Sequence, residues 1–303
     1  MKKIVYITLV LFSVSLAACT RESSKTTDTK TTPSTTDKKQ EDVKNNTTST
    51  DKKTSESGQN SSNEAAGNNG SDLPKFTQKV FTKNYKNCID TAEGCTYIQV
   101  YYPEMTDGKY KDKVNALVKD MALSCYSTDD VHYADFDKLI SQFMKDYEDF
   151  RKDVPDFPGG WTLKDSTSIV TNTTDILCLQ NTSESYLGGA HGAYNVAYTN
   201  FDMRNGNILK TKDIFIKGYE KTLNKLIEER IRKHFEMKPN ENLVEGGLFE
   251  NKVSFNDNFA IKKDGIEFLY NQYEIAPYAM GVIEIKLSYK DLDAILNKDV
   301  IKF

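Results

Sequence analysis

Three histidines, His132, His191 and His234, are the residues of this 303-residue chain best suited to acid-base or metal chemistry. A zinc peptidase needs a clustered pair of histidines, and these three lie far apart in the sequence. A serine hydrolase of the common type needs a G-x-S-x-G turn, which the chain does not contain. We therefore predict no catalytic residue and no metal site, and we predict that the chain is not an enzyme.

The glycines around His191 predict a turn. They stand in YLGGAHGAYN, residues 186–195, where Gly188 and Gly189 precede a predicted strand instead of a helix. A phosphate loop or a dinucleotide-binding turn would lead into a helix, so no cofactor is predicted. Glycine lets the backbone adopt positive φ. We expect a tight turn between two strands, in which His191 fixes the backbone through a side-chain hydrogen bond.

Carboxylates are numerous, because charged residues make up 28% of the chain, and the sequence singles out no pair of them. An envelope enzyme that acts on cell-wall glycan through scattered carboxylates is therefore kept as the alternative to a binding protein. The formal net charge is -4. A mildly acidic chain is not typical of nucleic-acid-binding proteins, but it would attract a basic partner.

The N-terminal residues resemble a bacterial secretion signal. Lys2 and Lys3 precede an apolar run from Ile4 to Leu16, and Ala17-Ala18-Cys19 follows. We expect residues 1–18 to be a signal peptide and Cys19 to be lipidated as the first residue of the mature protein. A plain cleavage site with an incidental cysteine is the alternative. Acyl chains at Cys19 would anchor the protein to the membrane, the outer one in a cell with two.

Residues 19–72 predict a disordered tether. After Cys19 the segment consists mainly of Thr, Ser, Lys, Asp and Asn, without an aromatic residue. Such a composition buries too little apolar surface to offset the entropy of folding. A flexible coil of this length spans roughly 40 Å. We expect an extracytoplasmic domain held off the cell envelope by this segment.

Four cysteines remain beyond Cys19: Cys88, Cys95, Cys125 and Cys178. In an oxidising compartment they predict disulfides, although four cysteines allow three pairings. The segment CIDTAEGC predicts a hairpin tip, which favours a local bridge from Cys88 to Cys95 and leaves Cys125 to Cys178 as the long one. Buried reduced thiols are the alternative, and the spacings match no zinc pattern.

Hydrophobic periodicity predicts one α+β unit, with antiparallel sheets, helices packed on them and two joined sub-domains. Pro103 should end the second strand. Strands are expected at 75–85, 96–102, 161–171, 175–185, 193–203, 255–262, 266–270 and 282–287. Helices are expected around 114–122, 136–150, 219–235 and 288–296.

Two stretches resemble a known family. GGAHGAYNVAYTNFDMRNGNILKTKDIF, residues 188–215, and FLYNQYEIAPYAMGVIEIKLSYKDL, residues 268–292, are similar to domain-of-unknown-function family 3298. The preceding half, with YIQVYYPEM, resembles the companion family 4163. The resemblance implies a 4163-like half at 73–159 and a 3298-like half at 160–303.

What the resemblance implies is binding. The same pair of domains forms the outer part of a lysozyme-capturing anti-sigma factor and precedes the catalytic domain of some peptidoglycan deacetylases. We therefore expect a lipid-anchored protein that recognises lysozyme or a related muramidase, with peptidoglycan binding or modification as the alternative. The predicted contact residues lie in the glycine turn and in the YEIAPYA loop: Gly188, Gly189, His191, Tyr273, Pro277 and Tyr278.

Overall fold

The computed structural model describes residues 73–89, 94–127 and 131–302. The predicted signal peptide, the predicted lipidation site Cys19 and the predicted tether lie outside these residues. Within the described part no helix is long and apolar enough to span a membrane.

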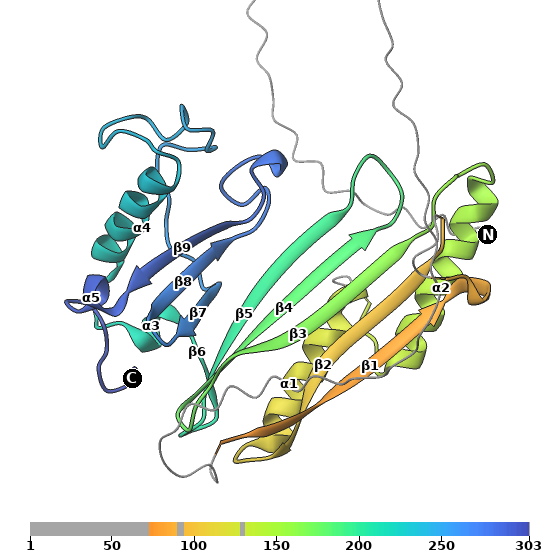
Figure 1. The fold of residues 1–303 in the computed structure, drawn as a ribbon, viewed down its shortest axis with the longest axis horizontal. Helices are drawn as coiled ribbons and strands as arrows, with labels where there is room; N and C mark the ends of the chain where they lie inside the picture. Colours follow the sequence, from red (N-terminus) through yellow and green to blue (C-terminus); the bar gives the residue numbers. More distant parts are fainter. Residues whose placement is uncertain (1–72, 90–93, 128–130, 303) are drawn as a thin grey trace, which may run out of the picture. The chain divides into compact units, whose positions relative to one another are not determined.

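A six-stranded sheet forms the centre of the domain (Figure 1). Its order follows the chain, and every neighbouring pair is antiparallel except β2 and β3, which run parallel. Parallel neighbours need a long crossover, and here α1 and α2 supply it. The strands are β1 (Lys75–Asn84), β2 (Tyr97–Asp107), β3 (Thr162–Asn172), β4 (Ile176–Tyr186), β5 (Ala193–Asp202) and β6 (Asn207–Leu209).

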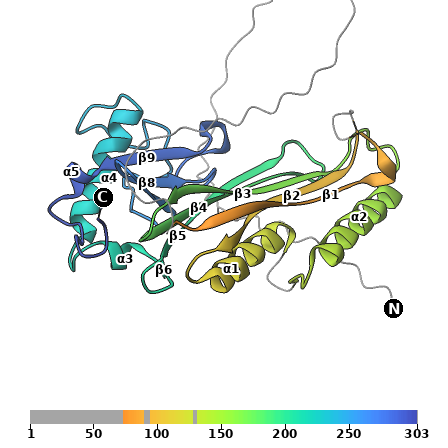
Figure 2. The same ribbon diagram turned by 60° about the horizontal axis from the view of Figure 1, so that its bottom comes forward.

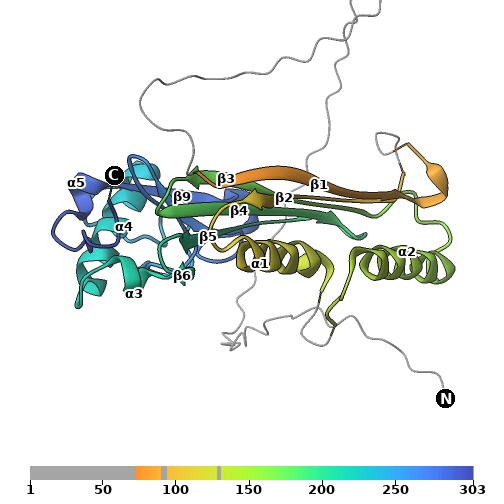
Figure 3. The same cartoon turned by 90° about the horizontal axis from the view of Figure 1, so that it is seen from below.

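The crossover helices cover one face of this sheet, as Figure 3 shows. They are α1 (Lys111–Leu123) and α2 (Phe136–Asp153), with the 3-10 turn η2 (Ser124–Tyr126) between them. The side chain of Asp135 caps α2 by accepting a hydrogen bond from the Lys138 amide at 2.8 Å. Leu139, Phe143 and Tyr147 recur at helical spacing and are buried against the sheet.

A second, three-stranded antiparallel sheet lies at one end of the large sheet, and α4 (Glu220–His234) packs on it (Figure 2). Leu223, Ile227 and Ile231 of α4 pack on this second sheet. The predicted α+β fold is thus confirmed. The remaining elements are β7 (Phe259–Lys262), β8 (Gly265–Tyr270), β9 (Ile283–Ser288), α3 (Thr211–Ile214), α5 (Tyr289–Leu292), η1 (Tyr85–Asn87) and η3 (Tyr278–Met280).

The prediction that Pro103 ends the second strand is wrong. β2 continues to Asp107, and Pro103 pairs in register with Gln78 of β1. The parallel pairing of β2 with β3 stops at Tyr101, so beyond this residue only one edge of β2 is paired. Proline lacks an amide hydrogen and is tolerated in a strand where one edge is free.

One of the two predicted disulfides forms. Cys88 and Cys95 are bonded between β1 and β2, with their Cα atoms 5.7 Å apart. The predicted bridge between Cys125 and Cys178 is wrong, because both are free. Cys125 packs among the residues under the helices, whereas Cys178 projects from the other face of the sheet toward Ala260 and Leu269. Burial raises the pKa of the Cys178 thiol to about 12, so it stays protonated.

Asparagine side chains join the two sheets. The outer edge of β5 pairs with β6 only from Asn200 to Asp202. At Tyr198 the amide donates to Asn258 Oδ1 at 2.8 Å, and at Val196 the carbonyl accepts from Asn258 Nδ2 at 2.9 Å. Asn271 adds a second two-way contact with Val196, at 2.8 and 3.0 Å. A side-chain amide carries a donor and an acceptor, as a peptide group does, so these residues replace a missing strand.

Asn200 belongs to β5, and its side chain bonds the backbone of β7. Its Nδ2 donates to the Phe259 carbonyl at 2.6 Å, and its Oδ1 accepts from the Ile261 amide at 3.0 Å. All of these groups are buried. Removing the Asn200 amide would leave a backbone donor and a backbone acceptor unpaired in the protein interior.

Asn200→Ala is therefore expected to lower the free energy of unfolding by about 2–5 kcal/mol, because each buried unpaired polar group costs roughly 1–3 kcal/mol. Urea unfolding followed by circular dichroism measures this change. Asn195→Ala is the matched control on the same strand, where the side chain is exposed. Equal stabilities of the two variants would show that the Asn200 contacts do not hold the sheets together.

Asp165 of β3 is buried on the helix-covered face, with 1% of its surface exposed. Its Oδ1 accepts from Asn181 Nδ2 at 2.9 Å, but its Oδ2 has no hydrogen-bond partner among the described residues. Burial raises the pKa of this carboxyl to about 7. The folded protein therefore holds a proton at Asp165 that the unfolded chain releases near its ordinary pKa of 3.8.

This difference predicts that the domain loses stability as the pH rises. The folded state binds more protons than the unfolded state between the two pKa values, so the contribution of Asp165 is greatest below about pH 4 and is lost as the pH passes 7. Asp165→Asn should remove this loss and raise the unfolding free energy above neutral pH by about 2–4 kcal/mol. Urea titrations across this range test it, with Asp156→Asn, an exposed site, as the control. A parallel pH dependence in wild type and Asp165→Asn would contradict the assignment.

Candidate functional site

The glycine turn between β4 and β5 has the conformation that its sequence predicts. Gly188 and Gly189 have φ values of 87° and 104°, in the region that favours glycine. A Cβ atom on Gly192 would lie 2.8 Å from the Ser185 carbonyl oxygen, so this position is closed to larger residues. Tyr186 Oη donates to the Gly189 carbonyl at 3.0 Å and closes the turn.

His191 is exposed at the tip of this turn. Its Nδ1 lies 2.9 Å from the Gly192 carbonyl oxygen, which is the side-chain contact expected from the sequence. Its ring also stacks on Tyr278, with the ring centroids 4.2 Å apart and the planes inclined by 28°. Tyr278 Oη donates to the same Gly192 carbonyl at 3.3 Å. The turn therefore binds a loop that is 86 residues away in the sequence.

That loop joins β8 to β9 and carries the other predicted contact residues. Tyr273 has φ 65° and is 59% exposed, and its ring centroid lies 5.8 Å from that of Tyr278. Pro277, also exposed, precedes η3 and sets its first turn. At the start of the loop Asn271 is bound to Val196 of β5. This anchoring residue had no predicted role, since nothing in the local pattern indicates a partner on β5.

We call His191, Tyr273 and Tyr278 the aromatic cluster. The structure places the predicted residues of the glycine turn and the YEIAPYA loop side by side at one surface. In this cluster the Tyr273 ring is exposed, while Tyr278 is half-buried with its Oη bonded to the Gly192 carbonyl. Its members stand on two turns whose ends are fixed by hydrogen bonds, so the rings are held in place before any ligand binds.

A buried carboxylate, that of Glu267, lies where the large sheet meets the second sheet. Glu267 of β8 is 8% exposed and accepts from Lys262 Nζ at 2.5 Å and from Tyr198 Oη at 3.1 Å. No local pattern in the sequence indicates these residues, because they come from β5, β7 and β8 and share no motif. Their mutual contacts satisfy the Glu267 carboxylate and join β5 to the second sheet.

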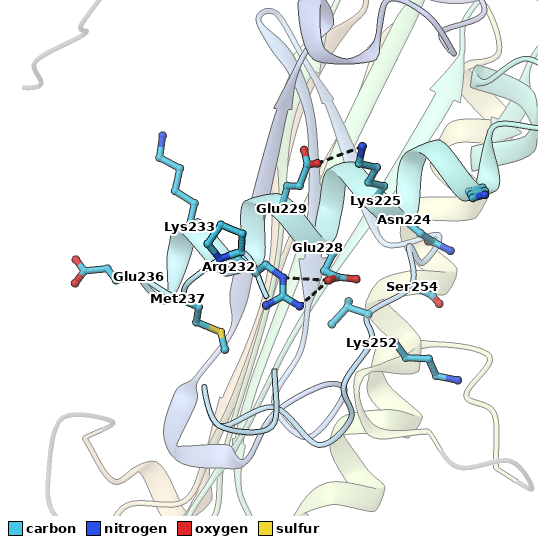
Figure 4. A pocket seen from close by; sticks show the side chains of 13 residues that line it. Asn224, Lys225, Glu228, Glu229, Arg232, Lys233, Glu236, Met237, Lys252 and Ser254 are labelled. Carbon is cyan, nitrogen blue, oxygen red and sulfur yellow. Dashed lines mark hydrogen bonds and ion pairs between the residues drawn. The ribbon is translucent and has the colours of Figure 1, made fainter. Parts of the chain in front are cut away.

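A groove with a volume of about 860 Å³ runs along α4 (Figure 4). Glu228 and Arg232 form an ion pair across one turn at 2.7 Å, and Lys225 lies 3.8 Å from Glu229. Arg232 also donates to the carbonyls of Lys238 and Glu241, which holds the segment after α4 against the helix. The groove contains none of the predicted contact residues. The two ion pairs in it join residues one turn apart on α4.

Metal ligands do not gather in the described part of the chain, which has no group of three His, Cys, Asp or Glu side chains suited to hold an ion. His234 is the last residue of α4, and its ring contacts Phe235 edge to face. His132 is exposed.

Two protein-family models match the chain. One is described as a protein of unknown function, DUF3298, and matches residues 212–290. The predicted resemblance to family 3298 is confirmed. The other is described as Deacetylase PdaC and matches residues 89–194. The glycine turn therefore falls at the end of the PdaC match and precedes the DUF3298 match. The predicted division into halves at residue 160 stays a prediction.

A curated relative is also described as a PdaC deacetylase. Peptidoglycan-N-acetylmuramic acid deacetylase PdaC of Bacillus subtilis (strain 168) is 26% identical over 210 residues, which cover 65% of this chain and 44% of that protein. The chain thus spans less than half the length of this relative.

Solved structures share the fold. A DUF3298 family member from Bacteroides fragilis matches with a TM-score of 0.59 at 23% identity, covering 76% of this chain and 97% of that one. A DUF3298 family protein from Pseudomonas aeruginosa PAO1 matches with a TM-score of 0.62 at 17% identity, covering 77% and 98%.

These comparisons correct one prediction. The chain was predicted not to be an enzyme, because no catalytic motif stands out in its sequence. Both the family model over residues 89–194 and the curated relative are described as deacetylases, which contradicts this prediction. The absence of a short motif was a poor guide, because catalytic groups often come together only in space.

The stacking of His191 on Tyr278 is expected to couple the two loops. In a double-mutant cycle with His191→Ala and Tyr278→Ala, the coupling free energy should be about 0.5–1.5 kcal/mol, the range of a ring pair beyond its buried area. Urea unfolding of the four proteins gives this value. His191→Phe keeps a ring and should retain the coupling. Additive effects of the two alanine substitutions would show that the rings do not interact in solution.

Proposed function

We propose that this protein acts in the cell envelope on peptidoglycan and that the aromatic cluster contacts the glycan strand. The observation that carries the proposal is the stacked pair His191 and Tyr278 with Tyr273 exposed beside it. The similarity to a peptidoglycan deacetylase supports the choice of ligand.

The chemistry of the cluster suits a sugar polymer. A pyranose ring has an apolar face of C–H groups, which packs on the face of an aromatic ring, and hydroxyls at its rim, which exchange hydrogen bonds with phenols and imidazole. The rings come from two turns fixed to the same strand edge by Asn271 and by Tyr278 Oη. Little conformational entropy is lost when a ligand binds to such a surface.

Lipidation at Cys19 and the tether of residues 19–72 would place this domain beside the wall. A coil of this length would let the domain sample the wall within roughly 40 Å of its anchor. The location proposed is extracytoplasmic and membrane-anchored. Fractionation of cells that express Cys19→Ala tests this, since loss of the anchor should release the protein into the soluble fraction.

A lysozyme-like protein is the second candidate partner. The formal net charge of -4 would attract a basic protein, and exposed Tyr273 and Pro277 have the character of interface anchors. The same loops cannot contact glycan and a protein partner at once, so the two candidates can be separated by competition.

The full-length chain should sediment with purified peptidoglycan, and His191→Ala/Tyr278→Ala should bind at least about 10-fold more weakly, a loss of about 1.4 kcal/mol. Tyr133→Ala, a half-buried tyrosine just before α2 on the helix-covered side of the sheet, controls for loss of any aromatic surface. Released acetate is measured in the same mixtures, because the relative is a deacetylase.

Retention of a c-type lysozyme on the immobilised protein, measured in the absence of peptidoglycan, separates the two partners. If lysozyme alone is retained and peptidoglycan neither binds nor releases acetate, the proposed ligand is wrong and the second candidate is favoured. If neither partner is retained, the aromatic cluster is not a binding site for either.

A further inference from the structure

Within the described residues, no helix covers one face of the six-stranded sheet, and the second sheet packs on part of it. Figure 1 looks onto this face, and Figure 3 shows α1 and α2 on the opposite one. The alternation along β3 is clear: Leu163, Asp165 and Thr167 are buried under the helices, while Ser166 and Ser168 are exposed. Antiparallel sheets can leave one face in water when its side chains are polar.

The exposed rows of this face carry hydroxyl, amide and phenol groups. Ser166 lies opposite Thr182 of β4, Ser168 lies opposite Gln180, and Tyr101 of β2 continues the row of Ser166. These side chains are exposed or half-buried. In the adjacent row Lys164 lies opposite Glu184, so the charges there have opposite sign. The surface is therefore polar, close to neutral and able both to donate and to accept hydrogen bonds.

The second sheet bounds this face on one side. β7 packs against β3, β4 and β5, and Thr171 Oγ1 donates to the Ile261 carbonyl at 2.7 Å. At the other end of β5 the face reaches Tyr194, which lies opposite Glu184 and follows His191 by three residues. The uncovered face is thus continuous with the edge of the aromatic cluster.

The neutral, polar side chains of this face favour some classes of ligand over others. A nucleic acid or another polyanion would require a basic surface, and a lipid or an amphipathic helix would require an apolar one. An uncharged polysaccharide presents hydroxyls and N-acetyl amides, which match serine, threonine and glutamine side chains, and apolar ring faces, which match tyrosine.

We propose that the uncovered face around Ser166 and Thr182 is a binding floor for an N-acetylated glycan strand, which extends the contact made by the aromatic cluster. This inference rests on the proposed function, since it assigns a longer footprint to the same ligand. It predicts that a chain of several sugars binds more tightly than a disaccharide.

Ser166→Arg and Thr182→Arg place a bulky side chain at the centre of the floor. Ser141→Arg is the matched control, because Ser141 is exposed on α2, on the covered side of the sheet. Full-length proteins are titrated with the β-1,4-linked hexasaccharide of N-acetylglucosamine and with its disaccharide, and are sedimented with purified peptidoglycan. Unfolding midpoints verify that all three variants fold.

If the floor binds glycan, each floor variant should weaken hexasaccharide binding at least about 10-fold, should change disaccharide binding little, and the control should match wild type. Wild-type binding that persists in both floor variants but disappears in His191→Ala/Tyr278→Ala would overturn the floor and leave the proposed function intact. Failure of wild type to bind peptidoglycan or either sugar would overturn both.

Discussion

Where β5 meets the second sheet, asparagine side chains take the hydrogen bonds that a neighbouring strand would otherwise take. Asn258 and Asn271 pair with the backbone of β5, and Asn200 pairs with the backbone of β7. A regular ladder would have continued the large sheet into the small one. Side-chain amides instead let the small sheet stand at an angle of its own while few buried polar groups stay unpaired. The positions of α4, of the loop after β8 and of the open face all depend on this junction.

The junction between the two sheets also positions the aromatic cluster at the surface. Asn271 holds the start of the loop that carries Tyr273 and Tyr278, and its partner Val196 lies only a few residues after the glycine turn. The two loops therefore meet because their bases are joined, and the stack of His191 on Tyr278 completes the contact. In physical terms the cluster is preorganised, which favours binding by reducing the entropy lost on complex formation.

The large sheet has two unlike faces, and both carry polar groups. On the helix-covered face, Asp165 is buried with one oxygen unpaired, and its stability cost grows as it ionises. On the other face, exposed hydroxyls and amides alternate with the buried positions of the same strands. The neutral polar face matches the hydroxyl and amide groups of the N-acetylated glycan proposed as its ligand.

Local patterns in the sequence sufficed for the α+β class, for most strands and helices, and for the Cys88 to Cys95 bridge, because hydrophobic period and short-range turn chemistry act over a few residues. The same patterns predicted the positive φ of Gly188 and Gly189 and the contact of His191 with its own turn. Local patterns could not predict contacts between residues that are far apart in the sequence. Pro103 stays within β2 because the edge beside it is free, and Cys125 cannot reach Cys178 because the sheet lies between them. Likewise, His191 meets Tyr278 only because an asparagine 80 residues beyond it in the sequence binds the edge of β5. Such contacts depend on which strands become neighbours, and tertiary packing alone determines that.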